Sequence, residues 1–178
     1  NEEASAHTWD VLKTVLQRCD SALNIAHAVT YECIRTIVQI DYTMELLEQA
    51  ADTVARFLYG DLPNLKYLGL TCLLSLVTIS PKYAKEHQQV VFECLGADAR
   101  AIQSTALRLM YAMATQENVE LIVTHLIQFV GQTVDGHLKA TIVNQIALLA
   151  DRLAPSNQWY VTTINSVIDL GARHLKED

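Results

Sequence analysis

Apolar residues recur in this sequence at a nearly constant interval of 36 or 37 residues. The first column of such residues consists of Val29, Leu65, Ile102 and Leu138. A second column, four residues further on, contains Cys33, Gly69, Ala106 and Ile142, and a third, eight residues further on, contains Ile37, Leu73, Met110 and Ile146. Offsets of four and eight place side chains on one face of an α-helix. The pattern therefore predicts an amphipathic helix that occurs once in each of four repeats.

A period in the upper thirties leaves room for a second helix before the next repeat begins. Stacks of helical hairpins of the HEAT and armadillo kind have this period. We therefore expect an all-α fold, a right-handed α-solenoid of such hairpins with about nine helices, and one continuous solenoid segment over residues 1–178. Solenoids of this kind offer an extended binding surface to partners and seldom catalyse reactions.

Turn residues and apolar spacing predict where the helices begin and end. A serine before a helix can accept a hydrogen bond from the first free amides, and proline suits the first helical position. We therefore expect Ser21 to cap the second helix and Ser80 to cap the fifth, with Pro81 as its first residue. The expected helices span residues 8–18, 21–40, 44–59, 64–79, 81–95, 99–114, 119–130, 138–153 and 156–170.

Gly69 stands inside one of these helices, where glycine costs about 1 kcal/mol relative to alanine. The equivalent residues of two other repeats, Cys33 and Ala106, are also small. Small residues at equivalent positions indicate that neighbouring helices cross there at short distance. We therefore expect a larger side chain at position 69 to overpack the contact.

Composition and charge exclude several classes of protein. Apolar residues make up 51% of the 178 residues, which is enough for a large helical core. No apolar run reaches the roughly 18 residues that a membrane-spanning helix needs. The net charge is −7, with lysine and arginine scattered singly, so we expect no nucleic-acid partner. Because the chain begins at Asn1 without a signal or transit sequence, we expect it to be an internal fragment of a longer polypeptide.

The four cysteines show no Cys-x-x-Cys spacing, and each lies among apolar neighbours; they are Cys19, Cys33, Cys72 and Cys94. Cysteines in such surroundings behave as small core residues. We therefore expect reduced thiols in a cytosolic protein. A disulfide framework is the competing interpretation.

The sequence carries no recognisable motif for catalysis, for cofactor binding or for a metal. Its six histidines form neither a His-x-x-x-His pair nor a His-Glu-x-x-His motif, and zinc requires three or four converging ligands. No nucleophile elbow surrounds a serine, and no glycine-rich phosphate loop is present. We therefore expect no catalytic, cofactor-binding or metal site, no cofactor and no enzymatic activity. The competing hypothesis is an enzyme with a non-standard site, which a buried and concave polar cluster would reveal.

Lys66, Lys82 and Lys85 lie near the expected turns of the second hairpin. If the three converge there, they could meet an anionic lipid head group, because clustered cations attract acidic surfaces. The alternative interpretation is an ordinary solvated edge.

Aromatic residues are expected to serve packing. Trp159 would fill the space between the last two helices, rather than stack on a ligand. Three tyrosines would set the packing angle between hairpins: Tyr67, Tyr83 and Tyr111.

Several stretches resemble the trunk of the adaptins, the large subunits of clathrin-adaptor-type complexes. They are residues 64–70 (NLKYLGL), 80–84 (SPKYA), 86–88 (EHQ), 93–95 (ECL), 109–111 (LMY), 118–119 (NV), 122–123 (IV) and 154–161 (APSNQWYV). The resemblance extends from about Asn24 to the C-terminus. Residues 44–51 (MELLEQAA) look most like epsilon-adaptin of the fourth adaptor complex, with gamma, delta and alpha adaptins as alternatives. Where many adaptins carry a cluster of basic residues, residues 98–104 of this chain contain one basic residue, Arg100.

The resemblance implies a structural and interaction scaffold within a heterotetrameric adaptor complex, acting in vesicle-mediated intracellular protein transport and cargo sorting. The implied partners are a small sigma subunit, a beta-type large subunit and a medium mu subunit, with an Arf-family GTPase reached through parts outside this segment. It also implies a cytoplasmic protein, held peripherally on trans-Golgi or endosomal membranes through the complex. The alternative is a HEAT-repeat scaffold of another class, such as a COPI-type coat subunit, a transport receptor or a phosphatase scaffold.

Overall fold

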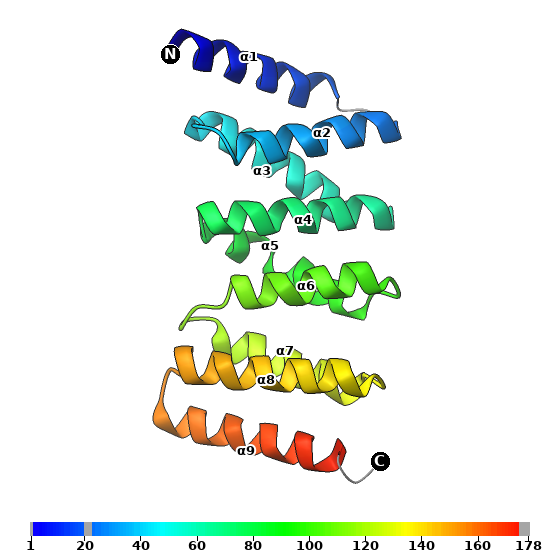
Figure 1. The fold of residues 1–178 in the computed structure, drawn as a ribbon, viewed down its shortest axis with the longest axis vertical. Coiled ribbons are helices and arrows are strands. Elements are labelled where there is room, and N and C mark those ends of the chain that lie inside the picture. The colour runs from blue at the N-terminus through cyan, green and yellow to red at the C-terminus, as the bar shows by residue number, and fades with distance from the viewer. Residues whose placement is uncertain (1, 20–22, 175–178) are drawn as a thin grey trace. The chain divides into compact units, whose positions relative to one another are not determined.

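The computed structural model describes residues 2–19 and 23–174 of the chain. These residues form nine α-helices and one short 3-10 helix, and contain no strand (Figure 1). The elements are α1 (Glu2–Arg18), α2 (Asn24–Ile37), α3 (Met44–Tyr59), α4 (Pro63–Ile79), α5 (Lys82–Glu93), η1 (Cys94–Gly96), α6 (Arg100–Ala112), α7 (Val119–Gln132), α8 (Gly136–Leu153) and α9 (Asn157–His174). The predicted all-α fold of helical hairpins is confirmed.

The chain divides into two compact units, Asn1–Ala112 and Met113–Asp178. In the first unit, α2, α4 and α6 lie side by side in one layer, and α3 and α5 form a second layer behind them (Figure 1). Helix α1 packs against both α2 and α3. In the second unit, α8 packs against α7 and α9.

The repeat columns account for much of the core. The residues at offset eight, which are Ile37, Leu73, Met110 and Ile146, are all fully buried. Those at offset four are buried as well. In the leading column only Ile102 is buried, and Val29 is exposed. The leading residues lie in the first or second turn of their helices, where the layer ends and fewer neighbours cover them.

The crossing predicted at Gly69 is present between α4 and α3. A Cβ atom added to Gly69 would lie 2.9 Å from the backbone nitrogen of Leu58 and 3.1 Å from its Cγ. Cβ atoms almost never approach a backbone atom so closely. The absence of a side chain therefore lets these two helices approach each other.

Two capping predictions differ from the structure. Helix α2 begins at Asn24 with Leu23 at its N-cap, whereas Ser21 lies outside the described residues. The predicted cap by Ser80 is wrong. Helix α5 begins at Lys82, its N-cap residue is Pro81, and no side chain caps its first turn. Ser80 instead ends α4, with its amide donating to the carbonyl of Leu76, so that only Ser80 and Pro81 separate α4 from α5.

Candidate interaction surface

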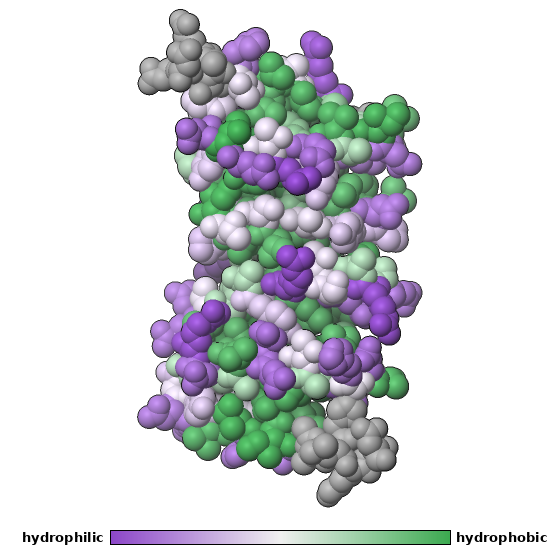
Figure 2. Space-filling model, in the orientation of Figure 1, coloured by the Kyte–Doolittle hydropathy of each residue, from purple (hydrophilic) through white to green (hydrophobic). Residues whose placement is uncertain are grey.

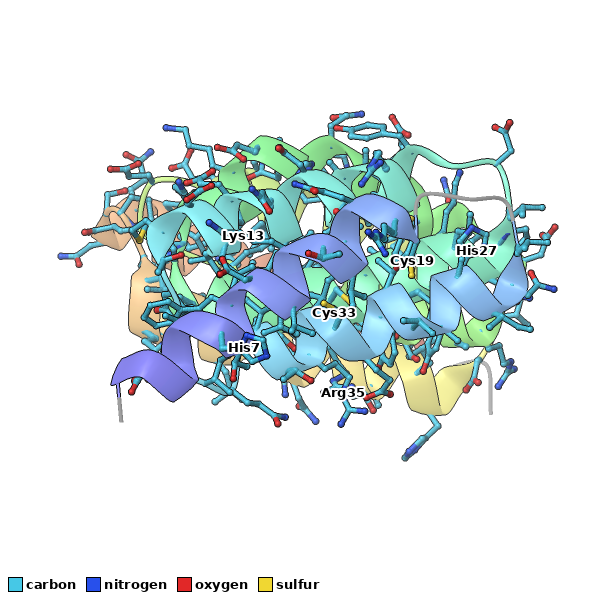
Figure 3. All side chains as sticks on the ribbon, turned by 90° about the horizontal axis from the view of Figure 1, so that it is seen from above. His7, Lys13, Cys19, His27, Cys33 and Arg35 are labelled. Carbon is cyan, nitrogen blue, oxygen red and sulfur yellow. The ribbon has the colours of Figure 1, made fainter. Side chains whose placement is uncertain are left out.

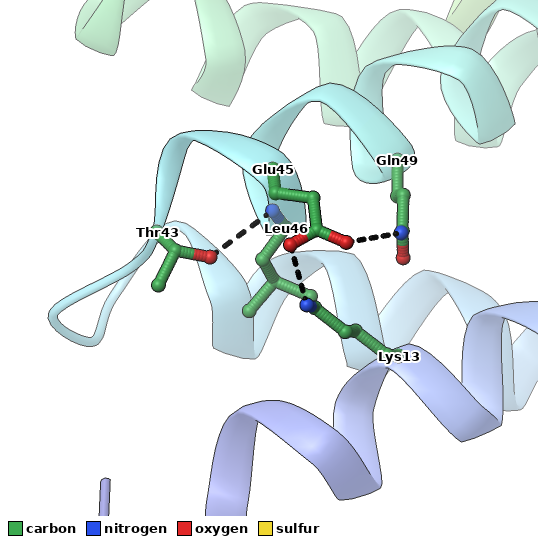
Figure 4. Close-up of polar contacts among 5 residues, drawn as sticks. All are labelled: Lys13, Thr43, Glu45, Leu46 and Gln49. Atoms are coloured by element: carbon green, nitrogen blue, oxygen red, sulfur yellow. Dashed lines mark hydrogen bonds and ion pairs between the residues drawn. The ribbon is translucent and has the colours of Figure 1, made fainter. Parts of the chain in front are cut away.

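One face of the first unit carries ion pairs that link neighbouring helices. The Lys13 ammonium on α1 lies 2.7 Å from the carboxylate of Glu45 on α3 (Figure 4). The other carboxylate oxygen of Glu45 accepts a hydrogen bond from the side-chain amide of Gln49. One turn further along α3, Glu48 pairs with Lys82 of α5. These pairs are solvated, and exposed ion pairs contribute about 0–1 kcal/mol each.

The start of α3 positions Glu45 for its contact with Lys13. The Thr43 hydroxyl accepts a hydrogen bond of 3.2 Å from the amide of Leu46, which caps the helix (Figure 4). Just before it, the indole of Trp9 on α1 donates to the carbonyl of Asp41 at 2.7 Å. The Trp9 contact holds the α2–α3 turn against α1, and the Thr43 cap fixes where α3 begins, so that Glu45 in the first turn of α3 comes within reach of Lys13 on α1.

The face formed by α2, α4 and α6 is different in character. Helix α4 contains a single charged residue, Lys66. Its outward side consists of residues three or four apart, which we call the α4 stripe: Tyr67, Thr71, Leu74, Ser75 and Thr78. All five are at least partly exposed. The band over α4, in the upper part of Figure 2, is accordingly mostly white, pale and green.

The hydroxyl groups of the α4 stripe are already bonded within the helix. Thr71 donates to the carbonyl of Tyr67 at 2.8 Å, and Thr78 donates to that of Ser75 at 2.6 Å. Ser75 lies 3.5 Å from the carbonyl of Thr71. Because these donors have partners in their own helix, the stripe presents mainly methyl groups and the Tyr67 ring outward.

Charged residues border the α4 stripe on both neighbouring helices. On α2, the Arg35 guanidinium lies 2.9 Å from the Glu32 carboxylate and 5.7 Å from the centre of the Tyr31 ring. Figure 3 shows Arg35 pointing away from the helix, on the side opposite Lys13. On α6, Arg100, Ser104 and Arg108 are exposed at four-residue intervals and share one face. The net charge of these residues is positive, in a chain whose total charge is −7.

The predicted convergence of three lysines is wrong. Lys66 lies in the first turn of α4, whereas Lys82 begins α5 after α4 has ended. Helix α4 has 17 residues, which corresponds to about 25 Å at 1.5 Å per residue. Lys66 lies near Cys94, at the end of the hairpin away from the α4–α5 turn. Burial raises the pKa of Cys94, and the charge of Lys66 lowers it by a smaller amount. Lys82 pairs with Glu48 at the other end of the hairpin.

Two of the histidines, His27 and His87, pack against aromatic rings. His27 meets Phe57 edge-on at 5.8 Å between ring centres, and the buried His87 meets Tyr59 at 6.0 Å. Among the described residues, no three His, Cys, Asp or Glu side chains are grouped so that they could hold a metal ion. The four cysteines are free thiols. Of the tyrosines, Tyr83 is buried as expected, but Tyr67 is 41% exposed because it lies on the outward side of α4.

Residues 1–178 match the family described as the adaptin N terminal region. The chain belongs to this family. The adaptin segment is 40% identical over 159 residues to the AP-4 complex subunit epsilon of Arabidopsis thaliana, which covers 89% of the chain and 17% of that relative. It is 34% identical over all 178 residues to the AP-4 complex subunit epsilon-1 of Mus musculus, covering 16% of that protein. The AP-1 complex subunit gamma of Dictyostelium discoideum is 28% identical over 99% of the chain and 20% of its own length.

These similarities confirm the resemblance to adaptins, with epsilon subunits at higher identity than this gamma subunit. The adaptin segment spans only about a sixth of the length of its AP-4 relatives. Within the part that the structure describes, none of its helices is long and apolar enough to cross a membrane.

The residues that carry the family resemblance have structural roles in the adaptin segment. Gly69 allows α4 to approach α3. The Asn118 side chain holds the turn before α7, accepting from the Thr115 amide at 2.7 Å and donating to the Met113 carbonyl at 3.1 Å. Ahead of the half-buried Trp159, the Ser156 hydroxyl accepts from the Trp159 amide and caps α9. The motifs therefore encode turns and helix contacts.

Proposed function

We propose that this chain forms part of the large subunit of an adaptor complex and acts as a scaffold, without catalysis, in vesicle-mediated protein transport. The observation that carries the proposal is the match of all 178 residues to the adaptin N terminal region. The relatives reported above are named as subunits of AP-4 and AP-1 complexes. This agreement favours an adaptor over the other HEAT-repeat scaffolds that the sequence alone left open.

The proposed partners are the other subunits of the complex: a small sigma subunit, a beta-type large subunit and a medium mu subunit. An Arf-family GTPase would act through parts of the large subunit outside this segment. We place the protein in the cytoplasm, held on trans-Golgi or endosomal membranes by the assembled complex. The α4 stripe supports a role in protein contacts, because it is uncharged and partly apolar.

The two units are proposed to be consecutive parts of one solenoid segment. The interval from Ile102, in the first unit, to Leu138, in the second, is 36 residues, the same as the interval from Val29 to Leu65 within the first unit. An unchanged interval supports a stack of repeats that continues from one unit to the next.

Co-purification tests the proposed function. The chain would be co-expressed in turn with the sigma, mu and beta-type subunits of each adaptor complex from one organism, and analysed by size-exclusion chromatography. We expect a stable one-to-one complex with the sigma subunit of a single adaptor type, which would also identify the type of large subunit. A helical, cooperatively folded chain that binds none of these subunits would contradict the proposal.

A further inference from the structure

We propose that the α4 stripe, together with Arg108 on α6, docks a protein surface that is uncharged at its centre and carries a carboxylate opposite Arg108. The inference rests on the proposed function, because it takes the partner to be another subunit of the adaptor complex. It adds the side of the segment that faces the partner and the chemistry that the partner presents.

Desolvation favours the α4 stripe over the face formed by α3 and α5. A partner that covers α3 and α5 must remove water from the Lys13–Glu45 and Lys82–Glu48 pairs. Removing charges from water is costly unless new bonds replace the lost ones. The hydroxyls of Thr71 and Thr78 already donate to carbonyls of their own helix, so covering them leaves no new unsatisfied donor.

Tyr67 gives the α4 stripe a side chain suited to a protein contact. Its ring is 41% exposed at the start of α4, and Thr71 lies one turn further on. Tyrosine and arginine are enriched where protein interfaces are most tightly packed.

Charge on the neighbouring helices determines which partner chemistry fits. Arg35 is neutralised by Glu32 on its own helix. Arg108 is exposed on α6 and has no hydrogen-bond or ion-pair partner among the residues that the structure describes. An arginine guanidinium binds a carboxylate through two parallel hydrogen bonds, so a carboxylate on the partner is the group that Arg108 would take.

An acidic membrane surface fits this face less well. Lipid-binding surfaces typically gather four to eight lysines or arginines within a short range. Here the α4 stripe has no charged residue, and α6 contributes only Arg100 and Arg108 to its border. A protein partner is therefore favoured, and vesicle binding becomes an outcome of the test.

Two matched pairs of variants test the docking surface. Arg108→Glu is compared with Lys85→Glu, which makes the same change of charge at an exposed position on α5. Tyr67→Ala is compared with Tyr42→Ala, which removes a ring of similar exposure from the α2–α3 turn. Affinity for the adaptor subunit that co-purifies with the wild-type chain is measured by isothermal titration calorimetry at two salt concentrations. Far-UV circular dichroism and thermal melting check that each variant is folded, and Arg108→Gln replaces Arg108→Glu if the latter does not fold.

We expect Arg108→Glu to weaken binding at least tenfold and Tyr67→Ala at least fivefold, with both controls within twofold of wild type. Salt should weaken the binding of the wild type more than that of the Arg108 variant, which lacks the positive charge. If the subunit binds wild type and all four variants alike, the docking surface is wrong and the proposed function stands. If no subunit binds the folded wild type, the proposed function fails and the docking surface with it. Binding of the wild type, but not Arg108→Glu, to phosphatidylserine vesicles in place of any subunit would also overturn the proposal.

Discussion

The backbone of α4 at Gly69 lies directly against the backbone of α3 at Leu58, since a Cβ atom at position 69 would be 2.9 Å from the Leu58 nitrogen. A backbone atom cannot move aside as a flexible side chain can. The contact therefore couples the spacing of two helices to the absence of a single methyl group.

Replacing Gly69 by leucine should lower the free energy of unfolding by about 1–3 kcal/mol, because overpacking forces the two helices apart. Chemical denaturation monitored by circular dichroism measures the change. Gly131→Leu is the matched control, since a Cβ at Gly131 in α7 would meet nothing within 4 Å. Equal stability of the two variants would show that the crossing at Gly69 tolerates a side chain.

Stability should depend on pH through His87. Burial lowers the pKa of His87 below its ordinary value of 6.5, against a smaller opposite effect of Glu86. The unfolded chain therefore binds a proton at a higher pH than the folded chain does, so stability is lost as the pH falls below about 6.5. We expect the free energy of unfolding to decline less between pH 7 and pH 5 in His87→Phe than in the wild type.

The matched control for this comparison is His7→Gln, since His7 is exposed on α1. The measurement is urea denaturation at several pH values, with the slope against pH compared among the three proteins. Identical slopes for His87→Phe and wild type would contradict the assignment to His87.

The four thiols should react at different rates in the folded protein. Burial raises the pKa of Cys33 to about 11 and that of Cys72 to about 12, so almost no thiolate forms at pH 8. Cys19 is only partly buried. With Ellman's reagent at pH 8 we expect one fast-reacting thiol, which Cys19→Ser removes, and release of the others only on unfolding. Fast labelling of Cys72 in the native protein would be inconsistent with its burial.

The two tryptophans can test whether the two units belong to one segment. Trp9 lies in the first unit and Trp159 in the second, so Trp9→Phe and Trp159→Phe each leave a fluorescence reporter in one unit. If the repeats form one continuous stack, both reporters should follow a single denaturation transition. Two separate midpoints, seen in both single variants and in the wild type by circular dichroism, would indicate independent units.

The sequence was most informative where a turn leaves little choice. Helix α3 spans Met44–Tyr59 as predicted, because Thr43 can cap its start and Gly60 to Pro63 allow no further helical turn. Where a serine and a proline are adjacent, as at Ser80 and Pro81, two helix ends compete for the same residues, and the end of α4 takes the serine. Local propensity does not determine the outcome of that competition.

The character of the two faces was not apparent from the sequence. Lys13 and Glu45 are 32 residues apart, and their pairing depends on how α1 crosses α3. The misplaced lysine cluster has the same origin, because closeness to a turn does not say which end of a hairpin a residue occupies. The low charge of α4 can be read from its residues. Whether that low charge produces an uncharged surface depends on which side of the helix its neighbours leave exposed.

Helix α4 has one charged residue in seventeen and is covered by α3, α2 and α6 on different sides. During synthesis, α2 and α3 leave the ribosome before α4, but α6 leaves only after α5. The delay between the emergence of α4 and that of α6 is roughly a few seconds at synthesis rates of about 5–20 residues per second. During that interval a nascent chain exposes the side of α4 on which α6 will pack. Chaperone engagement should therefore peak when α4 has emerged and α6 has not, and slowing translation over residues 80–112 should prolong it.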